Sequence, residues 1–231
     1  MKYSKHAFAI MLTLIFILTS GLSFADEERH TKKLKYKVTI TNLTRGQVFS
    51  PPIVIAHESN FSLFTLGDPA SDELAALAEG GATGQLAGLI DGVYPYDVAG
   101  GPIMPGDSDS VTLEIGKRSR SRLISVAGML VITNDAFFAV SDIWFLGRGK
   151  TMVEAEAYDA GSERNSEDCY YIPGPPCFRS GIRDTEGAEG YVHVHAGIHG
   201  PNPESADSEL NPAMYDWRNP VAKITIERIY H

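Results

Sequence analysis

Two acidic segments lie about two dozen residues apart, and each adjoins an apolar, strand-like run. The first holds Asp135 within Thr-Asn-Asp-Ala-Phe-Phe, and the second holds Asp159 and Glu163 within Tyr-Asp-Ala-Gly-Ser-Glu. If the two strand ends meet, three carboxylates share a small volume and repel one another unless a cation lies between them. Calcium prefers carboxylate, carbonyl and water oxygens as ligands. The spacing therefore predicts a calcium site made by Asp135, Asp159 and Glu163.

The same acids also fit a plainer interpretation. Aspartate and glutamate are common in solvated loops, and an aspartate such as Asp135 often caps a turn through its side chain. The Ala160-Gly161 step permits a sharp turn, which would let Asp159 and Glu163 converge. The residues alone leave both interpretations open.

Three histidines follow in the segment His193-Val-His195-Ala-Gly-Ile-His199. On a strand, His193 and His195 point to the same face, and the glycine before His199 could bend the chain back. Imidazole nitrogens in this arrangement predict a possible zinc or copper site. The alternative is a polar ladder in which His195 and His199 bond to backbone groups, and the segment supplies no clear fourth ligand.

The first 25 residues have the pattern of a secretory signal peptide. Lys2 and Lys5 precede an apolar run at residues 7–18, and Ser23-Phe-Ala25 supplies small residues for a cleavage site. The run is too short to span a bilayer comfortably, although an uncleaved anchor is the alternative. We expect a mature chain of residues 26–231 that is secreted or periplasmic, with no further membrane span.

The charge of the chain limits its partners. The formal net charge is −9, and removal of Lys2 and Lys5 makes it −11, because every acid follows residue 25. Such a chain repels nucleic acid and anionic membranes, and it has no basic tract interleaved with aromatic residues. The expected ligand is a protein or glycan outside the cell or in its envelope. Because about 200 residues can bury one core, we expect a single domain.

Cys169 and Cys177 are the only cysteines, and they enclose a segment rich in tyrosine, proline and glycine. In an oxidising compartment they are expected to form a disulfide, with two free thiols as the alternative. Their spacing, without further cysteines, is poorly suited to a zinc knuckle.

Strand patterns dominate the rest of the chain. Residues 35–43 alternate, with Tyr36, Val38 and Ile40 on one face. Residues 72–79 and 84–90 have helical spacing, with Ser71 as an N-cap, and residues 161–189 read as a long loop. Short strands joined by Gly- and Pro-rich connections predict an all-β fold, an antiparallel β-sandwich with a short helical insertion. The expected strands are residues 35–43, 51–56, 111–115, 122–133, 153–158, 190–196 and 221–230.

Four segments resemble the spondin N-terminal domain, the module found in F-spondin and mindin. These are residues 36–43 at the opening strand, 133–140 (Thr-Asn-Asp-Ala-Phe-Phe-Ala-Val), 158–163 (Tyr-Asp-Ala-Gly-Ser-Glu) and 220–228 at the last strand. The likeness extends over most of residues 26–231, and the Asp-Ala-Gly segment is its most specific part. The resemblance implies a calcium-binding β-sandwich in which Asp135, Asp159 and Glu163 hold the ion. The chain departs from the family pattern at Ala136, Ala139 and Glu163, where the family has Trp, Gly and Asp.

From these observations we expect an exported, calcium-binding adhesion or recognition module without catalytic activity. No segment has the pattern of a nucleophile elbow, a phosphate-binding loop or a catalytic triad. The alternative is a zinc- or copper-binding envelope protein or metalloenzyme that uses His193, His195 and His199. A third possibility is a structural envelope or matrix component whose acids only solvate loops.

Overall fold

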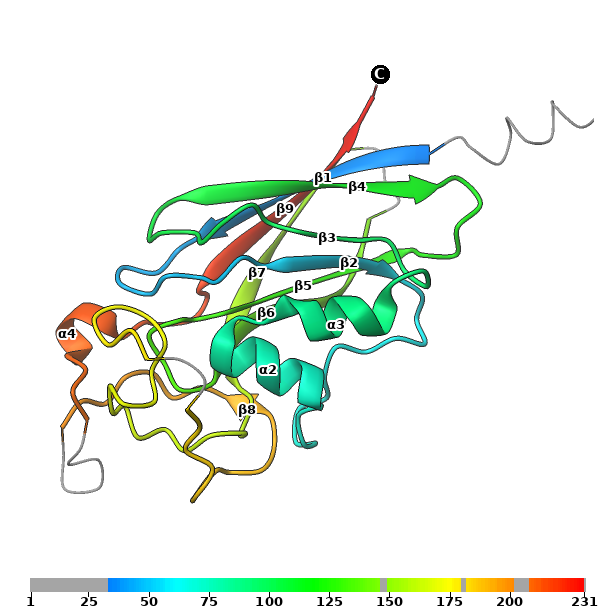
Figure 1. Ribbon diagram of the computed structural model, residues 1–231. Helices are drawn as coiled ribbons and strands as arrows, with labels where there is room; N and C mark the ends of the chain where they lie inside the picture. The colour runs from blue at the N-terminus through cyan, green and yellow to red at the C-terminus, as the bar shows by residue number, and fades with distance from the viewer. Residues whose placement is uncertain (1–32, 146–148, 180–181, 202–207, 231) are drawn as a thin grey trace, which may run out of the picture.

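The computed structural model describes residues 33–145, 149–179, 182–201 and 208–230 (Figure 1). The signal peptide predicted at residues 1–25 lies outside this part of the chain. Among the helices that the structure describes, none combines the length and apolar character needed to cross a bilayer.

The protein is all-β, with antiparallel strand pairing and a few short helices (Figure 1). Its described strands are β1 (Lys33–Asn42), β2 (Ile53–His57), β3 (Tyr96–Val98), β4 (Ser108–Gly116), β5 (Leu123–Met129), β6 (Ala136–Trp144), β7 (Lys150–Asp159), β8 (His193–Val194) and β9 (Ala222–Ile229). The described helices are α2 (Asp72–Gly80), α3 (Thr83–Ile90) and α4 (Pro212–Tyr215). The all-β class and the short helical insertion predicted from the sequence are confirmed.

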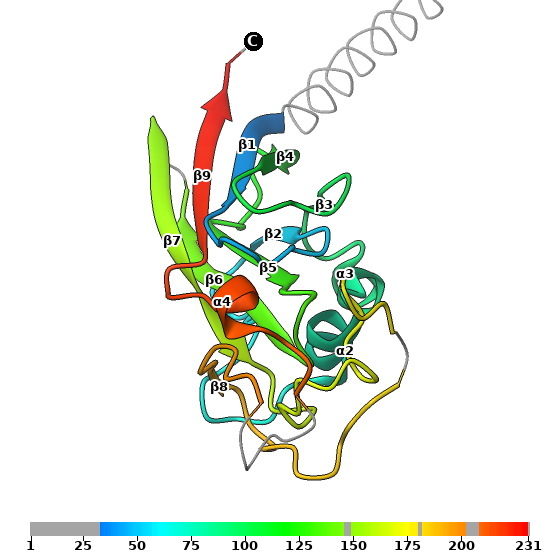
Figure 2. The ribbon, with the colours of Figure 1, turned by 90° about the vertical axis from the view of Figure 1, so that its left-hand side faces the viewer.

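The strands follow the order β3-β2-β5-β6-β7-β9-β1-β4, and β8 adds to β7. Strand β7 joins the two halves of this path, because Lys150 to Ala155 pair with β9 and Glu156 to Asp159 pair with β6. The two ends of the path approach each other, where Gly100 N donates to the carboxylate of Asp109 at 3.0 Å. The sheet is therefore nearly closed around a common interior (Figure 2).

The main core fills this interior. The alternating residues Tyr36, Val38 and Ile40 of β1 are at most 1% exposed, as their spacing predicted. They belong to one cluster with Val126 of β5 and Phe138 of β6. Full burial of one such side chain contributes about 1.5–3 kcal/mol. This core fixes the positions of the strand ends beside which the acidic residues lie.

Helices α2 and α3 cover the outer face of the β2-β5-β6 layer (Figure 1). Leu74 and Leu77 of α2 pack in one cluster with Ile53, Ile55 and Phe137 of the sheet. Ser71 caps α2 by accepting a hydrogen bond from Leu74 N, as expected. The helix ends at Gly81, which adopts φ 65°, where a side chain would be strained.

Four strand assignments differ from the sequence expectation, and the first is β3, where no strand was expected. The run expected at 122–133 ends at Met129, and the chain turns before β6 begins at Ala136, so Asp135 precedes a strand instead of following one. Strand β6 itself was not expected, because its buried start shows no alternation of apolar and polar residues. The strand expected at 190–196 shortens to β8, since Gly190 and Gly197 at its two ends adopt φ values of 81° and 96°.

The expected disulfide between Cys169 and Cys177 is present. It closes a small loop within the long segment that connects β7 to β8. This segment was expected to be a loop from residue 161 to 189, and its described residues contain no helix or strand. It carries side chains that reach the end of β7.

Candidate metal centre

The carboxylates of Asp135 and Asp159 come together because β6 begins where β7 ends. The register pairs Ala136 with Asp159, so Asp135 lies one residue beyond the pair. Ala160 N donates to the carbonyl oxygen of Asp135 at 3.2 Å and closes the junction. Both aspartates are 0% exposed. The structure therefore brings together two of the three acids that the sequence predicted as calcium ligands.

Asp135 uses one of its two oxygens. Its Oδ2 accepts hydrogen bonds from Ser162 N at 2.8 Å and from Glu163 N at 2.9 Å. Its Oδ1 is buried and has no hydrogen-bond partner within the described residues. Burial raises the pKa of Asp135 well above its usual value, and the nearby charge of Asp159 raises it further. A buried carboxylate oxygen in this position needs a proton or a cation as its partner.

Asp159 is held by the turn that follows it. Its Oδ1 accepts from Gly161 N at 2.7 Å, and its Oδ2 accepts from the side-chain amide of Asn165 at 2.5 Å. Burial raises the pKa of Asp159 above its usual value, although these two hydrogen bonds oppose the rise. The two hydrogen bonds fix the orientation of the carboxylate.

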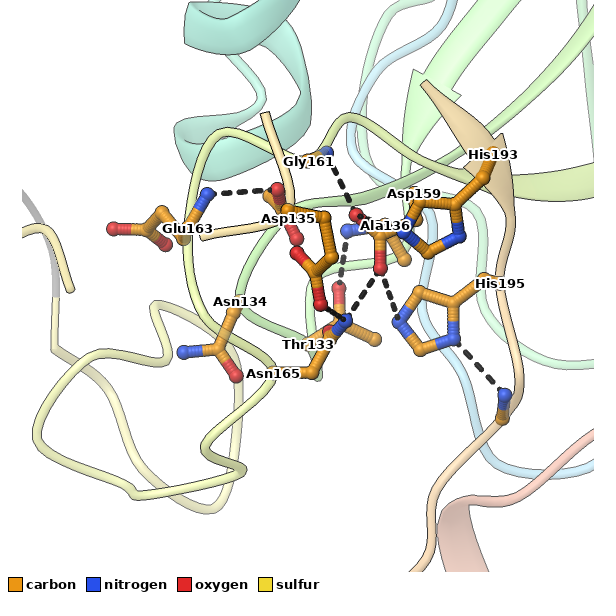
Figure 3. A network of polar contacts seen from close by, with 12 residues as sticks. Thr133, Asn134, Asp135, Ala136, Asp159, Gly161, Glu163, Asn165, His193 and His195 are labelled. Carbon is orange, nitrogen blue, oxygen red and sulfur yellow. Dashed lines mark hydrogen bonds and ion pairs between the residues drawn. The ribbon is translucent and has the colours of Figure 1, made fainter. Parts of the chain in front are cut away.

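Glu163 is buried, but its carboxylate points away from Asp159 and the histidines (Figure 3). Its Oε1 accepts a hydrogen bond from Asp184 N at 2.9 Å. Burial raises the pKa of Glu163 to about 7, and the charge of Glu79 in α2 contributes to the rise. Glu163 reaches the aspartate pair through its backbone N–H, which binds Asp135.

His193 and His195 lie on the other side of Asp159 (Figure 3). His193 Nε2 is 3.7 Å from Asp159 Oδ1, and His195 Nε2 is 3.8 Å from Asp159 Oδ2. Both nitrogens are buried and lack hydrogen-bond partners within the described residues. Strand β8 explains the placement, because its pairing with β7 sets His193 opposite Asp159.

His195 is neutral in this environment. Burial, together with the charges of His193 and His199, lowers the pKa of His195 from 6.5 to about 3. His199 differs from the other two histidines, because its side chain is 57% exposed and its Nδ1 is 3.9 Å from Glu167. The structure thus places His193 and His195 at Asp159, and it places His199 beside Glu167.

Glu189 belongs to this group and was not among the expected site residues. Asp159, Glu189 and His193 each offer one ligand atom, and these atoms all lie within 4.8 Å of one another. The amide of Asn165 donates to Asp159 and also to Glu189 Oε1, at 3.3 Å. The only sequence signal for Glu189 was its position four residues before His193, at the end of the long loop.

Gly161 lets the two segments approach. Its φ is 63°, and a Cβ built on it would lie 2.3 Å from the carbonyl oxygen of Tyr191. Gly190 N donates to the carbonyl oxygen of Gly161 at 2.8 Å. A side chain at position 161 would therefore push the Glu189–His193 segment away from Asp159.

Comparisons with known proteins add no assignment. No family model matches the chain, and a search of curated proteins gives no match. The likeness to the spondin N-terminal domain is therefore carried only by the segments described above, and the structure adds an all-β fold with one disulfide.

Proposed function

We propose that this chain is an exported recognition module whose binding surface is organised by a calcium ion at Asp135 and Asp159, with no catalytic role. The observation that supports the proposal is Asp135 Oδ1, a buried carboxylate oxygen that has no hydrogen-bond partner in the described structure. It belongs to a side chain that is close enough to Asp159 for the charge of Asp159 to raise its pKa.

A hard divalent cation would satisfy this pair of carboxylates. Burial of two neighbouring carboxylates without a cation is strongly unfavourable, and a calcium ion would compensate both charges. Backbone carbonyls and water would complete the six to eight oxygen ligands that calcium takes. Calcium is also the ion expected from the resemblance to the spondin N-terminal domain.

The ion would connect segments that are distant in sequence. Asp135 binds the backbone of Ser162 and Glu163, and Asp159 binds Gly161 and Asn165. A cation between the aspartates would fix the β7 end and the loop after it in one arrangement. Such preorganisation strengthens binding of a partner because fewer conformations are lost on association. The partner would be a protein or glycan of the extracellular space or envelope.

Thermal unfolding with and without calcium tests the proposal. Protein treated with EDTA should unfold at a lower temperature, and calcium in excess should restore the melting temperature. At a calcium concentration of about 100 times Kd, the gain is about 2.7 kcal/mol, which for this size raises Tm by about 5–10 °C.

Asp135→Asn should remove the calcium response, because it deletes the charge that lacks a partner. Asp97→Asn is the matched control, since Asp97 is an exposed acid on β3 that accepts a hydrogen bond from the backbone N–H of Val98. It should respond to calcium as the unmodified protein does. A wild-type protein whose Tm is indifferent to calcium would refute the proposal.

A further inference from the structure

The hydrogen bonds of His193 and His195 determine which ring nitrogen carries the proton in each neutral ring. A backbone carbonyl can only accept a hydrogen bond, and a backbone N–H can only donate one. His193 Nδ1 lies 3.1 Å from the carbonyl oxygen of Val194, so Nδ1 carries the proton and Nε2 has the lone pair. His195 Nδ1 instead accepts from Gly197 N at 3.0 Å, so its proton is on Nε2.

Two lone pairs therefore face each other at His193. Its Nε2 is 3.7 Å from Asp159 Oδ1, and with the ring neutral and the carboxylate ionised neither atom carries a proton to donate. The nitrogen is buried and has no hydrogen-bond partner within the described part of the chain. A histidine that binds a metal through Nε2 commonly donates its Nδ1–H to a backbone carbonyl, which is the arrangement found at His193.

We infer that Asp159, Glu189 and His193 bind a zinc ion or a similar transition-metal dication, in addition to the calcium proposed at Asp135 and Asp159. The inference rests on the ligand chemistry of the second side of Asp159 and does not require calcium. One imidazole nitrogen with two carboxylates suits zinc, whereas calcium prefers oxygen ligands alone. Three protein ligands leave one position of a tetrahedral zinc open for water or a partner group.

The distances are compatible with this ion. Zinc lies about 2.0–2.2 Å from nitrogen and oxygen ligands, so two ligand atoms of a tetrahedral site are about 3.3–3.6 Å apart. The 3.7 Å between His193 Nε2 and Asp159 Oδ1 is close to this separation. The widest separation in the group, up to 4.8 Å, needs a contraction of about 1.3 Å. The side chain of Glu189 is exposed, so it has room for this movement.

The groups around the three ligands also fit. Asn165 donates to the carboxylates of Asp159 and Glu189 and so holds them side by side. His195 is a positioning residue and not a ligand, because its Nε2–H faces Asp159 Oδ2 at 3.8 Å. Outer groups of this kind orient metal ligands, and their loss typically weakens metal binding by about 10–100-fold.

Zinc titration of the chelator-treated, full-length mature protein tests the inference, with competition against a chromophoric chelator as the readout. The unmodified protein should bind one zinc ion. His193→Ala and Glu189→Gln should each weaken zinc binding at least tenfold while keeping the melting-temperature response to calcium. His199→Ala is the matched control, because its exposed ring lies beside Glu167, and it should bind zinc normally.

His195 needs a separate comparison. His195→Ala should weaken zinc binding, and His195→Gln should restore much of it, because the glutamine amide offers an N–H in place of Nε2–H. The inference is overturned if the unmodified protein takes up no zinc. It is equally overturned if His193→Ala and Glu189→Gln bind zinc as tightly as the unmodified protein, since that zinc would be adventitious.

Discussion

Asp159 and His193 face each other across the β7–β8 pair, with Asp159 Oδ1 3.7 Å from His193 Nε2. Asp159 also pairs with Ala136 in the β6–β7 register, and Asp135 directly precedes Ala136. One aspartate at the end of β7 thus lies between an unpartnered carboxylate oxygen and an unpartnered imidazole nitrogen of the described structure. Both proposed ions depend on this position.

The close approach of Gly161 to Tyr191 predicts that a side chain at position 161 is destabilising. Gly161→Ala should lower the free energy of unfolding by about 1–3 kcal/mol, because φ 63° is strained for a side chain. It should also abolish zinc binding, since the new Cβ would displace Tyr191 and the segment that carries Glu189 and His193. Urea unfolding and zinc titration measure the two effects.

Gly88→Ala is the control for that substitution. Gly88 lies in α3, and a Cβ there would meet nothing within 4 Å. Alanine should be neutral or stabilising by up to about 1 kcal/mol at this position, with metal binding unchanged. If Gly161→Ala behaves like Gly88→Ala, the approach of the two segments does not depend on Gly161.

The raised pKa of Glu163 predicts a pH-dependent loss of folding stability. Its pKa is raised from 4.5 to about 7, so the folded protein binds more protons than the unfolded chain between these pH values. This stability penalty is therefore absent below about pH 4.5, grows as the pH rises from 4.5 to 7, and is complete above this window. Glu163→Gln removes the penalty, so its stability relative to the unmodified protein should increase across the window by up to about 3 kcal/mol.

Urea unfolding of both proteins at pH 4 and pH 8, in EDTA, gives this difference directly. A difference that is the same at both pH values would show that Glu163 does not titrate in this way.

The Glu163→Gln variant also tests whether Glu163 is a calcium ligand, as the sequence predicted. Because the Glu163 carboxylate binds Asp184 N and points away from Asp159, we expect Glu163→Gln to keep its calcium response.

The two histidines should differ in tautomer. Long-range proton–nitrogen correlation spectra of metal-free protein should show His193 protonated at Nδ1 and His195 protonated at Nε2. Zinc should shift the Nε2 resonance of His193 strongly and leave the tautomer of His195 unchanged. A His195 ring protonated at Nδ1 would contradict the positioning role and would make its Nε2 a ligand.

The disulfide should stabilise the loop after β7. Replacement of both Cys169 and Cys177 by serine should lower the free energy of unfolding by about 2–3 kcal/mol in the chain-entropy model. Zinc binding by the folded variant should persist, because the site residues lie outside the loop that the disulfide closes. Unfolding of the unmodified protein in a reducing agent should match the variant, and equal stability with and without reductant would contradict the prediction.

Local patterns were sufficient to predict much of the fold. The alternation of Tyr36, Val38 and Ile40 correctly predicted a strand with one buried face, and Ser71 correctly predicted the start of α2. Strand β6 was missed because Phe137 and Phe138 are both fully buried, one under the helices and one in the main core. A strand buried on both faces has no alternation to detect.

The site was harder to predict because it depends on tertiary contacts. The meeting of Asp135 with Asp159 was expected from two strand ends, but it arises from the register of a strand that was missed. The position of Glu189 depends on the pairing of β8 with β7 and on the space left by Gly161. The orientation of Glu163 depends on Asp184, a residue about twenty positions away that no local pattern connects to it.

Both proposals require that a divalent cation bind at Asp159 and its neighbours. Elemental analysis of the mature protein, purified without chelators from medium containing calcium and zinc, tests this most directly. We expect about one calcium and one zinc ion per chain, with both lost in Asp159→Asn. A folded protein that carries neither ion, and that takes up neither from micromolar zinc or millimolar calcium, would contradict both proposals.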